Sequence, residues 1–345
     1  MSVVDKLVRS QFFENKLINL RRWVPYFQYA YNRSYDINIH RQNRKYTTEL
    51  EQEVAAAQCA LTALGKPLKT LSHHGEIDMP NVIWMYWNTP LETAPEVVKL
   101  SIRSWTELNP SHEVRVLTDS NLRETLGFDF HAMFKLATVR LGMAAKSDIL
   151  RLYLLANFGG VWADATTFCL QPLEQWLPSA MSQHQFFSFR HQTNASRPVE
   201  AWFLAAPKQS AVIKLVLALF IENVFKPRQH SLFISNRRKM MGKIGIKRDH
   251  PRPLYADVLR ETERVGFMPY FSVGYFFNEA LRTHFSPEMI DKFYQLPNAH
   301  AIHGSDFSVY QSALVGKQTY KGSYQSEELF LQRKRYLEQL LNHQK

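Results

Sequence analysis

The sequence has little cysteine and lacks long apolar runs. Cys59 and Cys169 are the two cysteines among its 345 residues, so no disulfide framework and no cysteine-based metal site are implied, and a reducing compartment fits. The longest apolar candidate, residues 211–224, contains Lys214 and Glu222 and falls short of the roughly 18–20 uncharged residues that span a bilayer. This stretch predicts a buried helix instead.

The first residues also lack the apolar core of a secretory signal. Asp5, Lys6 and Arg9 interrupt the apolar side chains between Met1 and Phe13. Apolar residues make up 45% of the chain and charged residues 21%, which is typical of a folded soluble protein and not of a disordered one. We therefore expect a cytoplasmic protein with a large core.

Positive charge is in excess, with a formal net charge of +11 that is concentrated in two basic segments. The first contains Lys6, Arg9, Lys16, Arg21, Arg22, Arg33, Arg41, Arg44 and Lys45, and the second contains Lys226, Arg228, Arg237, Arg238, Lys239, Lys243, Lys247, Arg248 and Arg252. Three interpretations of these segments compete: a solvated surface, binding to an anionic membrane or a lipid-linked acceptor, and binding to nucleic acid. No helix-turn-helix, RRM, KH or zinc-finger pattern accompanies the charge, so we expect no nucleic-acid partner. A peripheral position at the inner face of a membrane, through the basic N-terminal segment, stays open.

Three zones follow one another along the chain. Residues 1–78 are predicted to form a helical, basic N-terminal extension, with an Ala-rich helix at 49–64 and a linker that includes 65–67 and 72–75. Residues 79–320 alternate strand-like and helix-like segments, which predicts an α/β layer architecture. Residues 321–345 are predicted to contain a C-terminal helix.

One segment, residues 144–166, combines charge with apolar surroundings. Its first part has helical periodicity, and Asp148 and Arg151 lie one turn apart on the same face. A Gly pair at 159–160 ends this helix, and Asp164 follows a short apolar strand at its carboxyl end, where α/β sheets bind ligands. An ordinary ion pair, worth about 0.2–0.5 kcal/mol, would explain Asp148 and Arg151. However, the helix is apolar on both sides of the pair, so we expect buried charges that need a partner such as a polyhydroxylated ligand.

The same segment resembles a known family. The block Ser-Asp-Ile-Leu-Arg at 147–151 and the block Gly-Gly-x-x-x-Asp at 159–164 resemble the donor-binding core of nucleotide-sugar glycosyltransferases with the GT-A fold. The resemblance is strongest to the bacterial capsular polysaccharide synthesis proteins, which are similar to the DXD-containing sugar transferases, and it covers about residues 81–173. It implies a GT-A (Rossmann-like) transferase domain over residues 79–320.

The resemblance also assigns roles to side chains. An early strand of the family carries a Trp that stacks on the nucleotide base, and Trp84, in the strand predicted at 82–87, matches it. In related enzymes the Asp and Arg that correspond to Asp148 and Arg151 contact hydroxyls of the donor sugar. The implied donor-binding residues are Trp84, Ser147, Asp148, Arg151, Asp164 and Thr166, and the implied catalytic residues are Asp148, Arg151 and Asp164.

The chain departs from the family pattern at the expected metal site. Thr166 replaces the second Asp, and a Thr hydroxyl is a poorer ligand than a carboxylate for the hard cations Mn²⁺ and Mg²⁺. We expect Mn²⁺ or Mg²⁺ at Asp164, with His303 as the downstream ligand that the resemblance implies. In the alternative, His303 is an ordinary histidine, and Arg or Lys side chains of the second basic segment neutralise the donor diphosphate without a metal.

The predicted function is transfer of a hexosyl group from a nucleotide diphosphate sugar to a glycan or lipid-linked acceptor in the synthesis of bacterial capsule or surface polysaccharide. The resemblance implies retention of the anomeric configuration by same-face attack. Two other functions stay open: a non-catalytic sugar- or nucleotide-binding protein derived from a transferase, and a glycoside hydrolase that uses Asp148 and Asp164 as its two carboxylates. Residues 200–206 and 269–276 either approach the acceptor or belong to the core.

Overall fold

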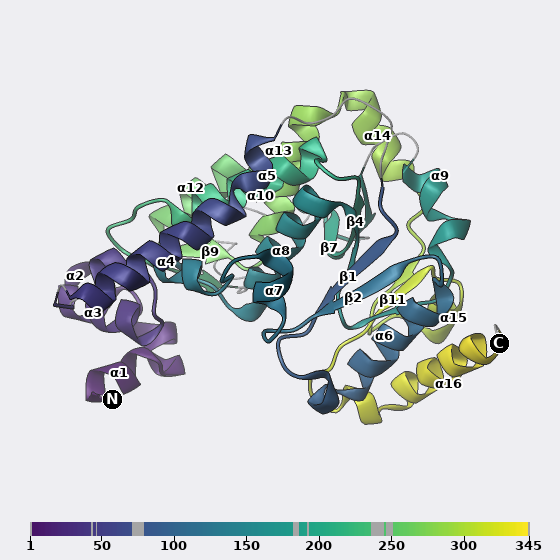
Figure 1. Ribbon diagram of the computed structural model, residues 1–345, viewed down its shortest axis with the longest axis horizontal. Helices are drawn as coiled ribbons and strands as arrows, with labels where there is room; N and C mark the ends of the chain where they lie inside the picture. The colour runs from purple at the N-terminus through teal and green to yellow at the C-terminus, as the bar shows by residue number, and fades with distance from the viewer. Residues whose placement is uncertain are drawn as a thin grey trace.

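The structure is a computed structural model of the chain, and it describes residues 2–42, 44–45, 47–70, 79–181, 186–191, 193–235, 245 and 251–343. Figure 1 shows a sheet with helices on both faces, a group of helices at the N-terminal end of the chain and a helix at the C-terminal end. This arrangement confirms the predicted α/β class. Two predicted features lie outside the described residues: the linker at 72–75 and, in the second basic segment, Arg237, Arg238, Lys239, Lys243, Lys247 and Arg248.

The central sheet has five strands in the order β2-β1-β4-β7-β6. Its parallel part is β1 (Val82–Tyr86), β2 (Glu113–Leu117) and β4 (Gly160–Ala163), and its antiparallel part is β7 (Val199–Ala206) and β6 (Phe187–Arg190). Every residue of β1 and β4 is buried, as expected for central strands that are covered on both faces. Strand β1 confirms the strand predicted at 82–87.

Two apolar cores flank this sheet, because alternate residues of β1 face opposite sides. Val82 and Trp84 belong to the first core, and Ile83 and Met85 belong to the second. The main helices of the first core are α8 (Met143–Phe158), α10 (Ala211–Phe225) and α13 (Ser272–His284), and those of the second are α6 (Glu96–Leu108) and α16 (Glu328–Asn342) (Figure 1). Helix α10 confirms the buried helix predicted at 211–224.

A second sheet, of three strands, begins directly after β4. Its order is β10 (His300–Ala301), β11 (Val315–Lys317) and β5 (Thr167–Cys169). Strand β11 pairs antiparallel with β5, with Lys317 opposite Thr167. This pairing brings a segment from near the end of the chain to the residues that follow β4.

The remaining elements are shorter or lie toward the ends of the chain. A third sheet consists of β3 (Val139–Arg140), β8 (Leu232–Ser235) and β9 (Phe267–Pro269). The N-terminal helices are α1 (Val3–Val8), a π-helix (Phe13–Leu17), α2 (Leu20–Trp23), α3 (Pro25–Ser34), α4 (Thr48–Leu64) and α5 (Lys66–Lys69). The other α-helices are α7 (Leu122–Leu126), α9 (Leu177–Met181), α12 (Tyr255–Arg264), α14 (Pro287–Gln295) and α15 (Phe307–Gln311). Short 3-10 helices occur at Ile39–Arg41, Leu91–Thr93, Ala132–Leu136, Leu173–Gln175 and Tyr324–Ser326.

Helix α4 confirms the helix predicted at 49–64, and α16 confirms a helix near the C-terminal end. The division into an extension at 1–78, a domain at 79–320 and a C-terminal part at 321–345 stays a prediction. Among the described residues, no helix combines the length and the apolarity that crossing a bilayer requires.

Candidate active site

A tight turn between α8 and β4 fixes the position of Asp164. Gly159 and Gly160 have φ angles of 73° and 98°, which L side chains rarely adopt. A Cβ on Gly159 would overlap the Lys208 backbone, and one on Gly160 would lie 2.6 Å from the Val82 carbonyl oxygen. Only glycine fits at both positions, so α8 ends here, as predicted, and β4 begins at once. Asp164 follows the last residue of β4.

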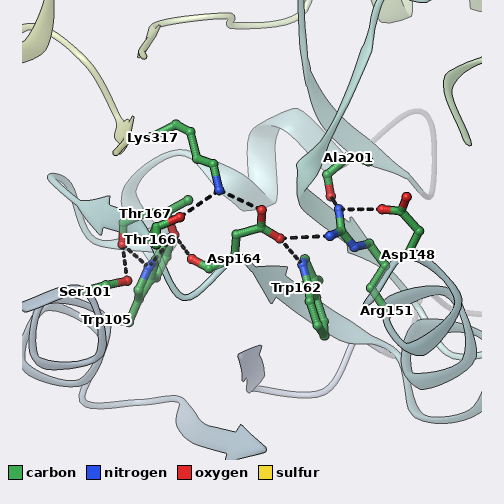
Figure 2. Close-up of polar contacts among 10 residues, drawn as sticks. All are labelled: Ser101, Trp105, Asp148, Arg151, Trp162, Asp164, Thr166, Thr167, Ala201 and Lys317. Atoms are coloured by element: carbon green, nitrogen blue, oxygen red, sulfur yellow. Dashed lines mark hydrogen bonds and ion pairs between the residues drawn. The ribbon is translucent and has the colours of Figure 1, made fainter. Parts of the chain in front are cut away.

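Arg151 joins two carboxylates that come from different elements (Figure 2). Its guanidinium lies 3.3 Å from Asp148 Oδ1, one turn earlier on α8, and 3.0 Å from Asp164 Oδ1. It also donates to the Ala201 carbonyl oxygen of β7 and lies 5.0 Å from the centroid of the Trp162 ring. Arg151 is 5% exposed, so it is a buried charge that charged and polar partners stabilise. Asp148, Arg151 and Asp164 therefore lie together.

Lys317 joins this group from a distant part of the sequence. As the last residue of β11, it places its ammonium 2.6 Å from Asp164 Oδ2 and 2.9 Å from Thr166 Oγ1 (Figure 2). Lys317 is not among the residues predicted from the sequence, because no local pattern marks it and only the pairing of β11 with β5 brings it to Asp164. We refer to Asp148, Arg151, Asp164 and Lys317 as the charged cluster.

The two carboxylates of the charged cluster differ in their tendency to ionise. Burial raises the pKa of Asp148 from 3.8 to about 6, against a smaller opposing effect of the Arg151 charge. Burial acts on Asp164 in the same direction, but the charges of Arg151 and Lys317 outweigh it and lower the pKa of Asp164. Hydrogen bonds from Lys317 and from the Trp162 indole N–H, at 2.6 and 2.9 Å, lower that pKa further. At neutral pH Asp164 is ionised, whereas Asp148 titrates close to that range.

Two further ionisable side chains lie within electrostatic range of the charged cluster. Burial raises the pKa of Glu200, on β7, and the charges of Lys317 and Asp164 also act on this carboxyl. Burial raises the pKa of Tyr270, directly after β9, and the negative charges of Asp148 and Asp164 raise it further. Glu200 and Tyr270 therefore extend the polar surroundings of the site beyond the residues predicted from the sequence.

Glu200 and Tyr270 belong to residues 200–206 and 269–276, for which the sequence leaves two interpretations: contact with the acceptor, or packing in the core. In residues 200–206, the side chains from Trp202 to Ala206 are buried, as core residues are. In residues 269–276, Tyr275 and Phe276 are buried, whereas Phe271 is 44% exposed. Each segment thus contributes mainly to the core and places one polar residue near the charged cluster.

A cavity of about 870 Å³ is lined in part by Ala145 and Lys146 of α8, which lie within one turn of Asp148. Tyr270 also lines this cavity, and the charges of Asp148 and Asp164 raise the pKa of its hydroxyl. Its charged lining consists of the cations Lys135, Arg140 and Lys146 and the carboxylates Glu14, Asp36, Glu53 and Asp129. The Lys146 ammonium lies 4.6 Å from the centroid of the Phe134 ring, and burial lowers the pKa of Lys146. The cavity therefore carries charged side chains of both signs.

Trp84, which is predicted to stack on a nucleotide base, is buried in the first core. It is 1% exposed, and its indole N–H donates to the Gly159 carbonyl oxygen at 2.9 Å. Its ring packs against Phe158, with 5.5 Å between the centroids. Protein atoms thus cover the ring, and the prediction that Trp84 stacks on a base is wrong. The reason is its place in the middle of β1, where helices cover both faces of the sheet.

The other predicted donor-binding residues lie beside the charged cluster. Ser147 precedes Asp148 on α8 and is half-buried, and Thr166 accepts a hydrogen bond from Lys317. Trp87, which is not among the predicted residues, follows β1 at the same edge of the sheet as Asp164. Its ring is half-buried and meets Tyr320 edge-on, with 5.1 Å between the centroids. Trp87 is therefore better placed than Trp84 to meet a ligand.

The residues around Asp164 do not fit a divalent cation. Mn²⁺ and Mg²⁺ prefer about six oxygen ligands that include carboxylates. Thr166 is neutral, and the Lys317 ammonium already lies against both Asp164 and Thr166. His303, the other expected ligand, is exposed, and its ring lies edge-on to Tyr324 with 6.2 Å between the centroids. Across the part of the chain that the structure describes, no three His, Cys, Asp or Glu side chains are grouped so that they could hold a metal ion.

The chain is similar to known proteins over much of its length. The family model described as capsular polysaccharide synthesis protein matches residues 13–232, which is more than half of the chain. HOC1 of Saccharomyces cerevisiae, described as a candidate glycosyltransferase, is 25% identical over 116 residues, which are 33% of this chain and 29% of that protein. The chain therefore matches less than a third of the length of this relative. Among solved structures, PaToxG glycosyltransferase is similar over 85% of this chain and 98% of that chain, with 14% sequence identity and a TM-score of 0.35.

Proposed function

The chain belongs to the capsular polysaccharide synthesis protein family, and we propose that it is a GT-A glycosyltransferase whose donor is a nucleotide diphosphate sugar. The transferred group is a hexosyl residue, and the acceptor is a hydroxyl of a glycan or lipid-linked saccharide in bacterial capsule or surface polysaccharide synthesis. The observation that carries the proposal is the charged cluster, in which two carboxylates share one buried guanidinium beside an ammonium and a cavity of about 870 Å³.

Asp148 and Arg151 have the chemistry to hold a sugar ring. Carboxylate oxygens accept hydrogen bonds from hydroxyls, and guanidinium N–H groups donate to them. Asp148 directs Oδ1 toward Arg151, so Oδ2 remains to accept from a ligand. Asp164 holds the Arg151 guanidinium from the other side and fixes its orientation. These contacts keep the sugar-binding groups in place before the donor arrives, which reduces the cost of ordering them on binding.

This cavity suits the nucleotide part of the donor. Pockets for small molecules enclose about 300–1,000 Å³, and the volume of about 870 Å³ lies in that range. Lys146 brings positive charge to this cavity, Arg140 is paired there with Glu14, and Tyr270 offers an aromatic ring in the lining. Trp87 and Tyr320 form a second aromatic pair at the carboxyl edge of the sheet. We place the base on one of these aromatic surfaces and the sugar on the charged cluster.

The geometry does not favour a glycoside hydrolase. A hydrolase needs two carboxyl groups that flank the glycosidic bond, about 5–9.5 Å apart with the substrate between them. Asp148 and Asp164 instead bind the same guanidinium, so Arg151 occupies the space between them. A transferase that retains the anomeric configuration by same-face attack does not require such a pair, and we propose this outcome for the chain.

Donor turnover tests the proposed function. The purified full-length chain is incubated with UDP-glucose, UDP-galactose, UDP-N-acetylglucosamine and GDP-mannose, with and without MnCl₂, and released nucleotide diphosphate is measured. We expect release from at least one donor, and a loss of about a hundredfold or more in Asp148→Asn, because a group that positions the sugar is removed. Glu113→Gln is the matched control, since Glu113 is an exposed carboxylate on β2 that pairs with Arg115.

Two results would change the assignment. Binding of a nucleotide sugar without any turnover would identify a non-catalytic binding protein. The absence of both binding and turnover for all four donors would overturn the proposal. Where an acceptor is found, the coupling constant of the anomeric proton in the product distinguishes retention from inversion.

A further inference from the structure

We propose that Lys317 takes the place of a divalent cation in this enzyme: its ammonium binds the donor diphosphate and stabilises the charge that develops on the leaving group. This inference rests on the proposed function, because it concerns the donor of that reaction. It replaces the expectation of Mn²⁺ or Mg²⁺ at Asp164.

The position of Lys317 follows from strand pairing and not from chance contact of a surface side chain. Strand β11 pairs with β5 so that Lys317 lies opposite Thr167, next to the Asp164–Thr166 turn. The ammonium lies 2.6 Å from Asp164 Oδ2 and 2.9 Å from Thr166 Oγ1 (Figure 2). The Lys317 side chain is 21% exposed, so it is anchored by the protein and still reaches solvent. An anchored and accessible cation is what a bound diphosphate requires.

The hydrogen-bonding capacity of Lys317 is only partly used. An ammonium has three N–H donors. Asp164 and Thr166 accept two of them, and within the described residues no other acceptor for Lys317 is found. One N–H therefore remains for a phosphate oxygen.

The charges at this position balance without a metal. Asp164 and Lys317 cancel each other, and Thr166 adds no charge. A divalent cation bound to Asp164 would lie close to the Lys317 ammonium, and like charges at such distances repel strongly. A diphosphate oxygen would instead accept a charge-assisted hydrogen bond from the Lys317 ammonium.

The chemical step balances with these groups. The acceptor oxygen forms a bond to the anomeric carbon, and the bond from that carbon to the diphosphate oxygen breaks. The electron pair of the broken bond stays on the diphosphate oxygen, which takes up the proton that the acceptor hydroxyl releases. Lys317 stabilises the negative charge on the diphosphate while the bond breaks, and such stabilisation is usually the largest contribution to catalysis of this kind.

Metal dependence gives the first test. Donor turnover by the wild-type chain is measured in EDTA and in MnCl₂, and we expect the two rates to agree within about twofold. Turnover that EDTA abolishes and MnCl₂ restores would overturn the role of Lys317 and leave the proposed function intact. If no donor is bound or turned over under either condition, the proposed function itself fails.

Binding gives a test that does not depend on activity. In EDTA, calorimetry should show that Lys317→Ala weakens UDP binding by about tenfold or more, whereas Lys317→Arg retains most of the affinity. Lys321→Ala is the matched control, because Lys321 is an exposed lysine four residues away. Equal UDP affinity in Lys317→Ala and wild type, with both chains folded by circular dichroism, would overturn the proposal.

A double variant tests the exchange of lysine for metal directly. Thr166→Asp combined with Lys317→Ala supplies a second carboxylate and removes the ammonium, so it should create a cation site. We expect electron paramagnetic resonance to detect Mn²⁺ binding by this double variant and not by the wild type. Mn²⁺ binding by the wild type with similar affinity would contradict the proposal.

We also infer, from a separate observation, that the N-terminal helices dock on an anionic lipid surface through residues 22–26, which we refer to as the Trp23 loop. The Trp23 loop consists of the last two residues of α2, Val24 and the first two residues of α3, and all five residues are exposed: Arg22, Trp23, Val24, Pro25 and Tyr26. Trp23 is 80% exposed, although Trp is rarely left in water by a folded chain. A protruding Trp and Tyr next to Arg is the composition of a membrane-interface anchor.

The charge around the Trp23 loop complements an anionic surface. Within residues 2–33, all of which the structure describes, the exposed charged side chains are Lys6, Arg9, Lys16, Arg22 and Arg33. The two acids of this stretch are engaged in ion pairs, Asp5 with Arg33 and Glu14 with Arg140. Three more apolar side chains of the stretch are exposed, namely Val3, Phe12 and Tyr29. Such a combination of exposed cations and apolar groups favours anionic lipid over a second protein copy.

Vesicle binding tests this second inference. The full-length chain should sediment with vesicles of equal parts phosphatidylcholine and phosphatidylglycerol, and less with phosphatidylcholine alone. Trp23→Ser should weaken binding to the mixed vesicles by about tenfold. Leu331→Ser is the control, since Leu331 is an exposed apolar residue of α16, at the far end of the molecule (Figure 1). Unchanged binding by Trp23→Ser, or a dimer in solution that this variant abolishes, would contradict the inference.

Discussion

Replacement of Asp148 by Asn should stabilise the protein at neutral pH and abolish its activity. Burial raises the folded-state pKa of Asp148 from 3.8 to about 6. Because the folded-state pKa lies above the unfolded-state value, the protonated carboxyl favours the folded chain. This stabilising contribution is fully present below pH 3.8 and is lost as the pH rises through about 6. The amide introduced by Asp148→Asn does not titrate, so the variant should lack this pH dependence.

The size of the effect follows from the two pKa values. A difference of about 2 pKa units corresponds to about 3 kcal/mol between fully protonated and fully ionised conditions. The Asp148 side chain is 14% exposed, so solvent screens it little. Between pH 4 and pH 7 the wild type should lose about 2–3 kcal/mol of unfolding free energy from this group, and Asp148→Asn should not lose it.

Urea unfolding of the two chains at pH 4 and pH 7 measures this difference. Other titrating groups are common to both chains and cancel in the comparison, provided that the m values agree. The unfolding free energy of Asp148→Asn, relative to the wild type, should rise by about 2–3 kcal/mol from pH 4 to pH 7. A relative change below about 0.5 kcal/mol, or a change of opposite sign, would refute the assignment of Asp148 as a buried carboxyl with a raised pKa.

Three further predictions concern the turn, the core and the cluster. Gly160→Ala should lower the unfolding free energy by about 2–4 kcal/mol, because a Cβ there would lie 2.6 Å from the Val82 carbonyl oxygen at a φ of 98°. Gly127→Ala is the control, because Gly127 has a φ of 76° and no atom lies within 4 Å of the added Cβ. In urea unfolding this variant should lower the unfolding free energy by only about 1 kcal/mol, and equal losses in the two variants would contradict the steric explanation. Trp84→Phe should destabilise by about 2 kcal/mol, since it leaves the buried Gly159 carbonyl oxygen without its indole donor, and should leave the dissociation constant for nucleotide unchanged in calorimetry. Asp164→Asn should destabilise by about 3 kcal/mol and eliminate donor turnover, because Arg151 and Lys317 lose their shared counter-charge; a folded variant with wild-type turnover would contradict the role of the cluster.

The sequence predicts the elements around the site because their signals are local. Strand β1 is a short apolar run, and α8 has helical periodicity that ends at a Gly pair. The positive φ angles and close contacts at Gly159 and Gly160 admit only glycine, so the Gly pair marks the turn in the sequence. The turn brings Asp164 back to Asp148 and Arg151, as the sequence predicts. The buried charge of Arg151 is expected from the sequence, because the helix is apolar on both sides of the Asp148–Arg151 pair.

Two features could not be predicted, for different physical reasons. Lys317 reaches Asp164 through the pairing of β11 with β5, and such a non-local pairing leaves no pattern in either segment. The orientation of Trp84 could not be predicted from the sequence, because β1 is apolar at every position. A strand that is buried on both faces has no alternation of polar and apolar residues that would show which side chains face a ligand. For this reason the resemblance assigned the base to a Trp whose ring is buried.

A crystal structure of the full-length chain with a bound nucleotide sugar, grown in EDTA, tests the central claim most directly. We expect the sugar hydroxyls within hydrogen-bond distance of Asp148 and Arg151, and a diphosphate oxygen within the same distance of the Lys317 ammonium. A donor bound at another place on the molecule, with these side chains still paired only to one another, would contradict the account.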